Sequence, residues 1–365
     1  MINLLTVFLF SIPIIFASYL VDKKYYLRIQ ILATAAFLGY QSPTSLFIFT
    51  LLTVGNYLIL HQSNLSGNLK LSIVILIVFL VLLGFKFFVS IDKNILLPIG
   101  ISYYSFKLIH YALEYYKGKT AKTSFTEYLA YFFYLPVILI GPINRFNSFV
   151  NEIGKKRLNT DYLSAGFERI LYGISKIQIV ASYLITIKLA GLIEILPAQS
   201  IWLKTYLESL KFVFNAFFMF SGYSDVAIGL SLLVGIRLNE NFNYPFLSTN
   251  MREFWSRYHM SLSEFCKDYI YTPITSYYRN PKAGIFLTMI IIALWHEITP
   301  RYVIWGLLQF IGIYFSTTIK IGNSVILRNF CRLIVINFFV FSCVIISRDS
   351  FAEAIDTYKI LLFIP

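Results

Sequence analysis

Long apolar runs alternate with short polar breaks along almost the whole chain. The hydrocarbon core of a bilayer is about 30 Å thick, so a helix that crosses it needs roughly twenty apolar residues. The pattern predicts helices over Ile2–Leu20, Leu27–Tyr40, Leu46–Leu60, Leu71–Val89, Leu96–Tyr116, Tyr128–Ile143, Phe167–Leu196, Trp202–Phe220, Val226–Ile236, Ala283–Trp295, Tyr302–Ile319 and Leu327–Ile346, with an amphipathic end at Phe351–Ile364. Because some runs are too short to span, we expect about ten to thirteen helices, several of them tilted, broken or re-entrant.

The composition supports a membrane protein. Of 365 residues, 58% are hydrophobic and only 13% are charged, which excludes an ordinary soluble globular protein. No soluble domain interrupts the apolar pattern, so we expect one membrane-embedded domain over residues 1–365 of an all-α polytopic protein. The first run lacks a basic segment before it, and Ala17-Ser18-Tyr19 is a poor cleavage site, so it is expected to be a retained helix.

The basic residues predict an orientation. They cluster at Lys23-Lys24-Arg28, Lys117-Lys119-Lys122 and Lys155-Lys156-Arg157, whereas Gln41–Thr44 carries no charge. The positive-inside rule then places the N-terminus outside and the Lys23 and Lys117 loops in the cytoplasm. The net charge of +13 is therefore interpreted as a signal for orientation and for anionic lipid, and no nucleic-acid partner is expected.

Polar residues become more frequent after Asn215, and Asp225 is the sharpest case. It follows the hydroxyls of Ser221, Tyr223 and Ser224 and precedes an apolar run. In hydrocarbon, a carboxylate survives only where protein or a water-filled cavity satisfies it. Two compatible roles are open for this residue: it lines a cavity, or it caps a helix at an interface.

Asn250–Tyr271 reads as one amphipathic helix. Asn250 followed by Glu253 has the spacing of a capping box, and Thr272-Pro273 is expected to end the helix. An apolar stripe recurs at three- and four-residue steps, and His259 falls opposite it on a polar, cationic face. That position fits a functional histidine and an interfacial surface histidine equally well.

His296 stands in a polar break between two apolar segments. The segment before it, Ala283–Trp295, would rise only about 20 Å as a helix, less than the thickness of the hydrocarbon core. The break therefore predicts a broken helix below the membrane surface, of the kind from which membrane proteins build sites. The three cysteines, Cys266, Cys331 and Cys343, are isolated, and no pair has metal or redox spacing, so neither a metal nor a bound cofactor is expected.

Several motifs resemble the membrane-bound O-acyltransferase family in order and spacing. They are FSGYSDVAIG (220–229), ENFNYPF (240–246), EFWSRYHMSLSEFCKDYIYTPI (253–274) and LWHEITPRYVIWG (294–306), and the segments 97–119, 140–146 and 347–363 also match in order and spacing. The resemblance is greatest to the membrane subunits of alginate and exopolysaccharide O-acetylation. It covers 96–365, with 1–95 as N-terminal helices, and it implies a helical domain pierced by a central tunnel.

The resemblance also implies a reaction and the residues that carry it. His296 corresponds to the family's catalytic histidine, and His259 to its second functional histidine. We expect the imidazole of His296 to act as base on an acceptor hydroxyl, since its ordinary pKa near 6.5 suits that task. His259 would orient the substrate or polarise the thioester carbonyl. The further candidates for substrate binding are Asn241, Asn243, Asp225, Ser263, Trp295 and Glu297, the last standing where the family commonly has glycine.

The expected reaction moves an acyl group, most simply acetyl, from a cytoplasmic thioester to a hydroxyl of a cell-surface polysaccharide or a partner protein. The donor would be acetyl-CoA or an acyl-loaded carrier protein, attracted by the basic loops. An extracytoplasmic polysaccharide-modifying partner and a location in the bacterial cytoplasmic membrane are also expected. D-alanyl transfer to teichoic acid is the alternative reaction within the family. A transporter or flippase, or an inactive scaffold, is the alternative outside it.

Overall fold

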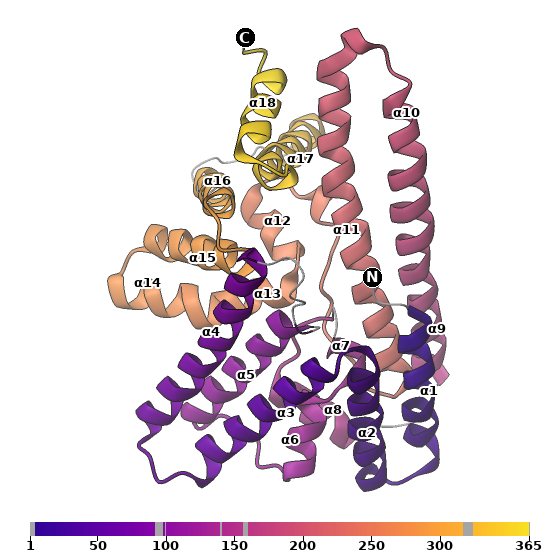
Figure 1. Cartoon of the computed structure of the whole chain (residues 1–365), viewed down its shortest axis with the longest axis vertical. Coiled ribbons are helices and arrows are strands. Elements are labelled where there is room, and N and C mark those ends of the chain that lie inside the picture. Colours follow the sequence, from indigo (N-terminus) through magenta and orange to yellow (C-terminus); the bar gives the residue numbers. More distant parts are fainter. Residues whose placement is uncertain are drawn as a thin grey trace. The chain divides into compact units, whose positions relative to one another are not determined.

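The computed structural model describes residues 4–91, 98, 100–138, 141–155, 160–316 and 324–364. Within these ranges the chain is helical apart from its connections and contains no strand. The all-α architecture is confirmed (Figure 1). Lys156 and Arg157, and the predicted boundaries at Ile2, Leu96 and Ile319, lie outside the described residues.

Five helices among the described residues are long and apolar enough to cross a membrane. They cover Pro43–Gln62, Gly67–Phe87, Thr160–Glu194, Ala198–Leu233 and Val325–Ser347, and two shorter apolar helices cover Leu4–Leu20 and Pro281–His296. This set confirms a multi-pass membrane protein. The 35 residues of Thr160–Glu194 would extend about 52 Å, well beyond the hydrocarbon thickness.

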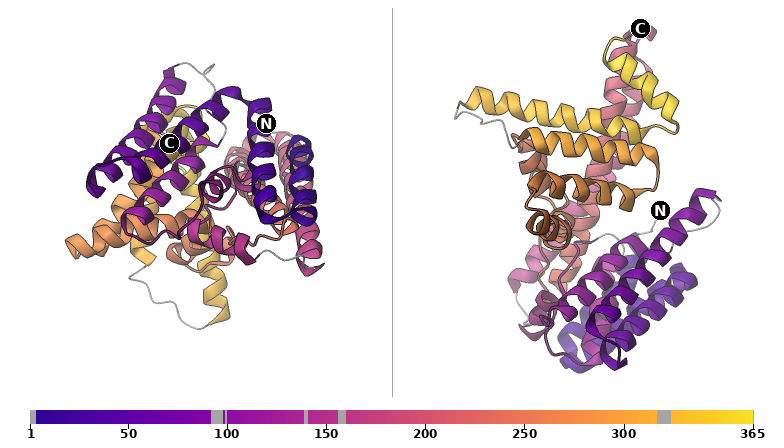
Figure 2. Two further views of the ribbon diagram at one scale, coloured as in Figure 1. Left: turned by 90° about the horizontal axis from the view of Figure 1, so that it is seen from below. Right: turned by 90° about the vertical axis from the view of Figure 1, so that its left-hand side faces the viewer.

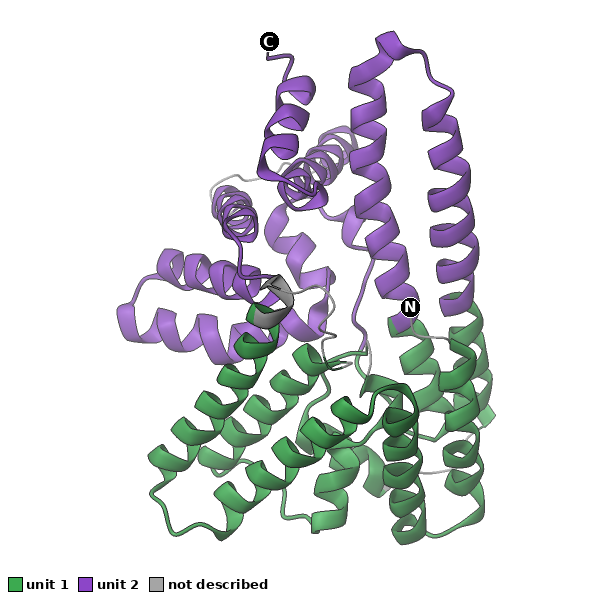
Figure 3. Ribbon diagram, in the orientation of Figure 1, with its two compact units in different colours: residues 1–172, 224–239 green, residues 173–223, 240–365 purple. Residues whose placement is uncertain are grey.

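Two compact units alternate along the chain (Figure 3). The first contains 1–172 and 224–239, and the second contains 173–223 and 240–365. Two continuous helical segments pass from one unit to the other, because the divisions fall within Thr160–Glu194 and within α11 (Ile201–Leu233).

The first unit is built from helices that match most of the predicted runs. Its helical segments are α1 (Leu4–Leu20), α2 (Lys23–Gln41), α3 (Pro43–Tyr57), the π-helix η1 (Leu58–Gln62), α4 (Gly67–Ile91), α5 (Ile101–Tyr116), α6 (Phe125–Phe132), α7 (Leu135–Ile138), α8 (Phe146–Lys155) and most of α9 (Thr160–Ile174). The run predicted over Tyr128–Ile143 is interrupted, since α6 ends at Phe132 and α7 begins at Leu135.

Aromatic rings form much of the core of the first unit. Tyr111 of α5 contacts the rings of Tyr128, Phe132 and Phe146 edge to face, with centroids 4.8, 6.0 and 4.8 Å away. Edge-to-face pairs of this kind contribute about 0.5–1.5 kcal/mol beyond the apolar area that they bury. The packing of α5, α6 and α8 therefore depends on aromatic geometry as well as on area.

The second unit contains the motifs at 240–246, 253–274 and 294–306 and the remaining helices. These are the π-helix η2 (Ser175–Leu189), α10 (Ala190–Glu194), the 3-10 turns η3 (Ala198–Ser200) and η4 (Pro245–Leu247), α12 (Met251–Arg257), α13 (Met260–Cys266), the π-helix η5 (Lys267–Tyr271), α14 (Thr272–Tyr278), α15 (Pro281–His296), α16 (Pro300–Ser316), α17 (Val325–Ser347) and α18 (Phe351–Leu361). In the right view of Figure 2, α16 and α17 run side by side, and they are packed against each other.

A glycine allows α15 and α16 to approach closely. A Cβ atom added at Gly306 of α16 would lie 2.9 Å from the Ala293 Cβ and 2.9 Å from the Met289 carbonyl oxygen of α15. Real Cβ atoms do not approach other atoms so closely, so only glycine fits at this crossing. The contact holds α15 in place at Ala293, which is three residues before His296, the last residue of the helix.

The prediction of separate helices over Trp202–Phe220 and Val226–Ile236 is wrong. The structure has one helix, α11, of 33 residues across both runs. The helix continues because Asp225 is neutralised within it: its Oδ1 lies 2.9 Å from the Arg169 Nε of α9. A cap role for Ser224 or Asp225 is therefore excluded, since both lie inside the helix.

Candidate active site

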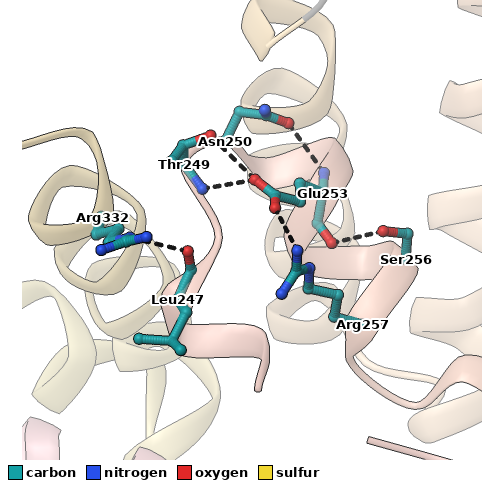
Figure 4. Close-up of polar contacts among 7 residues, drawn as sticks. All are labelled: Leu247, Thr249, Asn250, Glu253, Ser256, Arg257 and Arg332. Carbon is teal, nitrogen blue, oxygen red and sulfur yellow. Dashed lines mark hydrogen bonds and ion pairs between the residues drawn. The ribbon is translucent and has the colours of Figure 1, made fainter. Parts of the chain in front are cut away.

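The helix predicted over Asn250–Tyr271 begins as expected. The Asn250 side chain accepts a hydrogen bond from the Glu253 backbone N–H at 2.9 Å, which confirms the cap (Figure 4). The capping box does not form, because the Glu253 carboxylate accepts instead from the Thr249 N–H and hydroxyl at 2.8 and 2.9 Å. Burial alone would raise the pKa of Glu253, but the Thr249 bonds and the charge of Arg257 lower it.

The same helix breaks after two turns, which the sequence analysis did not predict. α12 ends at Arg257, and α13 begins at Met260. Between them His259 adopts the left-handed conformation, with φ 48° and ψ 52°. A non-glycine residue in this region costs about 1–2 kcal/mol. The interpretation of Thr272-Pro273 as an end is also wrong, because α14 begins at Thr272 with the proline in its first turn.

Backbone bonds from the preceding loop hold this break open. The Asn243 N–H donates to the Arg257 carbonyl at 2.9 Å, and the Met260 N–H donates to the Asn241 carbonyl at 2.8 Å. The groups on both sides of the break are thus satisfied by residues 241–243 instead of by the next turn of helix. As a result His259 is buried, with 3% of its surface exposed, and does not lie on a polar, cationic helix face as predicted.

Asn241 fixes the ring of His259. The Asn241 Oδ1 lies 3.2 Å from the His259 Nδ1 and also accepts from the Ser261 backbone N–H at 3.3 Å and hydroxyl at 2.8 Å. A backbone N–H can only donate, so this atom of Asn241 is the oxygen. His259 therefore donates through Nδ1–H, and its lone pair lies on Nε2.

Burial keeps His259 neutral. His259 lies outside the helices that are long enough to cross the membrane. Its burial, and to a smaller extent the charge of the nearby His296, lowers the pKa of His259 to about 3. The edge-to-face contact with the Phe220 ring, whose centroid is 4.7 Å away, covers the imidazole with apolar surface. A neutral imidazole in a fixed tautomer can accept a hydrogen bond from a substrate or hold a proton at a defined atom.

His296 is the last residue of α15, as the polar break predicts. The next helix, α16, begins at Pro300, and Glu297 ends α15 with its N–H donating to the Ala293 carbonyl at 3.1 Å. Three aromatic rings surround the imidazole of His296, those of Trp295, Tyr302 and Trp305, with centroids 4.6, 5.9 and 5.6 Å away. In contrast to His259, His296 is exposed in the isolated chain.

Aromatic contacts connect the elements that carry the two histidines. The Trp305 ring beside His296 contacts Trp255 of α12 with centroids 6.1 Å apart, and Trp255 contacts Tyr258 at 5.9 Å. The Trp255 indole N–H donates to the Gln309 Oε1 of α16 at 3.2 Å, and Gln309 in turn donates to the Ser342 hydroxyl of α17 at 2.6 Å. Because these polar groups are buried and satisfied by one another, they hold α12 and α16 in a defined register.

The other predicted site residues have different surroundings. Ser263 donates to the Tyr258 carbonyl at 3.3 Å, so it supports the break after α12. Asn243 and Glu297 are exposed, and Trp295 is half-buried beside His296. Asp225 belongs to the first unit and pairs with Arg169, whereas the other predicted residues belong to the second unit.

Three residues in this arrangement were missed by the sequence analysis. Ser261 and Trp305 stand in motifs in which only other residues were selected as candidates, and Gln309 lies three residues after the motif that ends at Gly306. Ser261 lies two residues after His259, and its hydroxyl was the available signal. Gln309 had a clearer signal, as an amide with apolar residues on both sides in the middle of α16, and the structure buries it.

These observations define a polytopic helical membrane protein with a buried, fixed histidine and an exposed histidine at a helix end. Residues 30–352 match the membrane-bound O-acyltransferase family. This match covers most of the chain, so the protein belongs to that family.

Individual relatives are similar over shorter or longer parts of the chain. The probable alginate O-acetylase of Pseudomonas fluorescens is 30% identical over 342 residues, which cover 89% of this chain and 67% of that protein. The corresponding protein of Pseudomonas aeruginosa is 35% identical over 221 residues, covering 58% and 41%. The teichoic acid D-alanyltransferase of Bacillus subtilis is 31% identical over 228 residues, covering 59% and 57%. The chain thus spans between about two fifths and two thirds of the length of these relatives.

Proposed function

We propose that this protein is an O-acyltransferase that moves an acetyl group from a cytoplasmic thioester to a hydroxyl of an extracytoplasmic polysaccharide, directly or through a partner protein. The proposal rests chiefly on the pair of histidines: His259 is buried, neutral and fixed by Asn241, and His296 is accessible at the end of α15. The names of the alginate O-acetylase relatives support acetyl transfer onto a polysaccharide. A location in the bacterial cytoplasmic membrane is part of the same proposal.

In this mechanism His296 takes the proton from the acceptor hydroxyl as the oxygen attacks the thioester carbonyl. The C–S bond then breaks, and the proton passes from His296 to the departing thiolate, which leaves as the free thiol. His296 is exposed, so its imidazole can receive an acceptor that enters from outside the protein. A positioned general base contributes about 10²–10⁴ in rate. The aromatic rings of Trp295, Tyr302 and Trp305 contact the imidazole and restrict its rotation.

His259 positions the substrate. With Nδ1–H committed to Asn241, its Nε2 accepts a hydrogen bond from the substrate, most simply from the acceptor hydroxyl before the proton moves to His296. Asn243, Ser263 and Glu297 complete the proposed substrate surface at the edges of the two breaks. Asp225 is proposed to act with Arg169 in substrate passage.

The test compares acetyl transfer in membranes that contain wild type, His296→Ala or His259→Gln at equal abundance. Labelled acetyl-CoA is the donor, and label is followed into polysaccharide and protein. We expect His296→Ala to retain less than about a hundredth of the activity, because no other group takes the proton. His259→Gln, which keeps a hydrogen-bonding side chain, should retain measurable turnover. Full activity of His296→Ala would contradict the base role.

D-alanyl transfer is the second candidate, supported by the similarity to the Bacillus subtilis D-alanyltransferase. A parallel assay with a D-alanyl-loaded carrier protein decides between the two donors. Transfer from that donor alone would replace acetyl with D-alanyl in the proposal. It would leave the roles of His296 and His259 unchanged.

A further inference from the structure

A cavity in the second unit is lined by charged side chains that have no role in the histidine site. It has a volume of 390 Å³ and lies among η2, α11 and the end of α17. The residues that matter here are Thr186, Glu208, Lys211, Asn215, Ser347 and Arg348. The volume falls at the lower end of the range of small-molecule sites, about 300–1,000 Å³.

The spacing on α11 directs its polar side chains to this cavity. Glu208, Lys211 and Asn215 recur at three- and four-residue steps, so they share one face of the helix. Asn215 is held by its amide, which donates to the Thr186 hydroxyl at 2.7 Å and to the Ala181 carbonyl at 3.1 Å. The wall formed by η2 and α11 is therefore fixed.

The cavity has one carboxylate and two cations. Glu208 Oε2 pairs with Arg348 Nη1 at 3.1 Å, which neutralises that arginine. Lys211 makes no ion pair or hydrogen bond with any residue that the structure describes, and the Nε of Arg348 is buried without a hydrogen-bond partner among them. One positive charge, that of Lys211, thus remains on a helix that is long and apolar enough to cross a membrane, and an unused donor of Arg348 remains on the same cavity wall. A cation in such a place needs a counter-charge.

The cavity is also connected to the proposed base. Arg301 donates through Nη1 to the backbone carbonyl of Arg348, and the ring of the next residue, Tyr302, stacks on His296 with centroids 5.9 Å apart. A group bound beside Arg348 is therefore held next to the helix start that contacts the catalytic imidazole. An acceptor anchored there would be held near the start of α16, where Tyr302 stacks on His296, and this would help to orient its hydroxyl.

We propose that this cavity binds an anionic group, a carboxylate or phosphate, carried by the acyl acceptor, with Lys211 supplying the charge that recognises it. The inference rests on the proposed function, because it takes the ligand to be the acceptor. It goes beyond that function by assigning a charge to the acceptor and a recognition residue to the enzyme.

The test measures binding and not turnover. The purified protein is placed in nanodiscs of phosphatidylcholine, and its thermal unfolding is followed with D-glucuronate, glucose 6-phosphate or glucose added in increasing concentration. A ligand that binds the folded state raises the unfolding temperature. We expect at least one of the anionic probes to raise it and neutral glucose to leave it unchanged.

Variants assign the effect to Lys211. Lys211→Gln should weaken the response by about tenfold or more, as expected for the loss of a charge-assisted bond, and Lys211→Arg should restore part of it. Without ligand, Lys211→Gln should unfold at the same temperature as wild type, since Lys211 has no bond to lose. Lys204→Gln is the matched control: the residue is a half-buried lysine two turns earlier on α11, outside the cavity, and should respond as wild type does.

The proposal is overturned by equal responses in wild type and Lys211→Gln, by an equal response to glucose, or by no response to any probe. A response that needs phosphatidylglycerol in the nanodisc and no sugar acid would assign the cavity to a lipid head group and overturn acceptor binding. His296→Ala separates this proposal from the proposed function, because it should lose acyl transfer and keep the anion response.

Discussion

The Oδ1 of Asn241 lies 3.2 Å from the Nδ1 of His259, and both side chains are buried. The same oxygen accepts two bonds from Ser261. One amide oxygen therefore sets the tautomer of the imidazole and joins the loop before α12 to the first turn of α13.

Replacing Asn241 by alanine should lower both stability and activity. Each buried donor left without an acceptor costs about 1–3 kcal/mol, and His259 and Ser261 would both lose theirs. We expect a lower unfolding temperature and a fall in kcat of about tenfold or more, since the imidazole loses its fixed tautomer. Asn239→Ala is the control, because Asn239 lies exposed in the same loop. Wild-type turnover in Asn241→Ala would show that the tautomer does not matter.

The lowered pKa of His259 predicts a loss of stability in acid. The unfolded chain binds a proton on this residue below about pH 6.5, whereas the folded chain keeps it neutral down to about pH 3. The stability that His259 contributes is therefore complete above pH 6.5 and is lost as the pH falls from 6.5 toward 3. Unfolding temperatures measured from about pH 7.5 to about pH 5 should fall more steeply in wild type than in His259→Gln. Parallel curves for His259→Gln and wild type would refute the assignment.

The loops that precede α2 and α6 should face the cytoplasm. Lys23 forms an ion pair with Glu127 at 2.6 Å, so these two helix starts lie on one side of the first unit. Tyr116 at the end of α5 donates to Asn68 at the start of α4 at 2.6 Å, which adds a further loop to that side. Because the positive-inside rule makes this the cytoplasmic side, a cysteine at position 119 should react with a membrane-impermeant reagent only after cell lysis, and one at 41 in intact cells. Wild type gives the background from its own cysteines, and the reverse pattern would invert the topology.

Much of the helical pattern was predictable, because membrane burial acts on each apolar run locally. The ends of α15 and α17 fall within two residues of the predicted boundaries, and the break at His296 is where the polar residues indicate. The break at His259 was not predictable from periodicity. It depends on backbone bonds from Asn241 and Asn243, which lie outside the apolar stripe.

Long-range pairing also explains the other principal error. Asp225 was predicted to lie between two helices, as a cap or as part of a cavity wall, but Arg169 of α9 neutralises its carboxylate and α11 continues through it. Charge partners from distant segments leave no periodic signal in the sequence around the residue that they satisfy. Their effect becomes visible only when the packing of α9 and α11 is known.

Gly306→Ala tests whether the packing of α15 against α16 positions His296. The added methyl group would lie 2.9 Å from both the Ala293 Cβ and the Met289 carbonyl oxygen, so the helices must separate. Overpacking of this kind costs about 1–3 kcal/mol, and a displacement of about 1 Å near a reacting group can cost about 10² in rate. We therefore expect a lower unfolding temperature and a fall in kcat of about tenfold or more, measured as acetyl transfer at equal membrane abundance.

Gly55→Ala is the matched control, because a methyl group at this helical glycine of α3 meets no atom within 4 Å and should leave activity unchanged. Equal turnover in the two variants would mean that the close crossing at Gly306 does not set the position of His296.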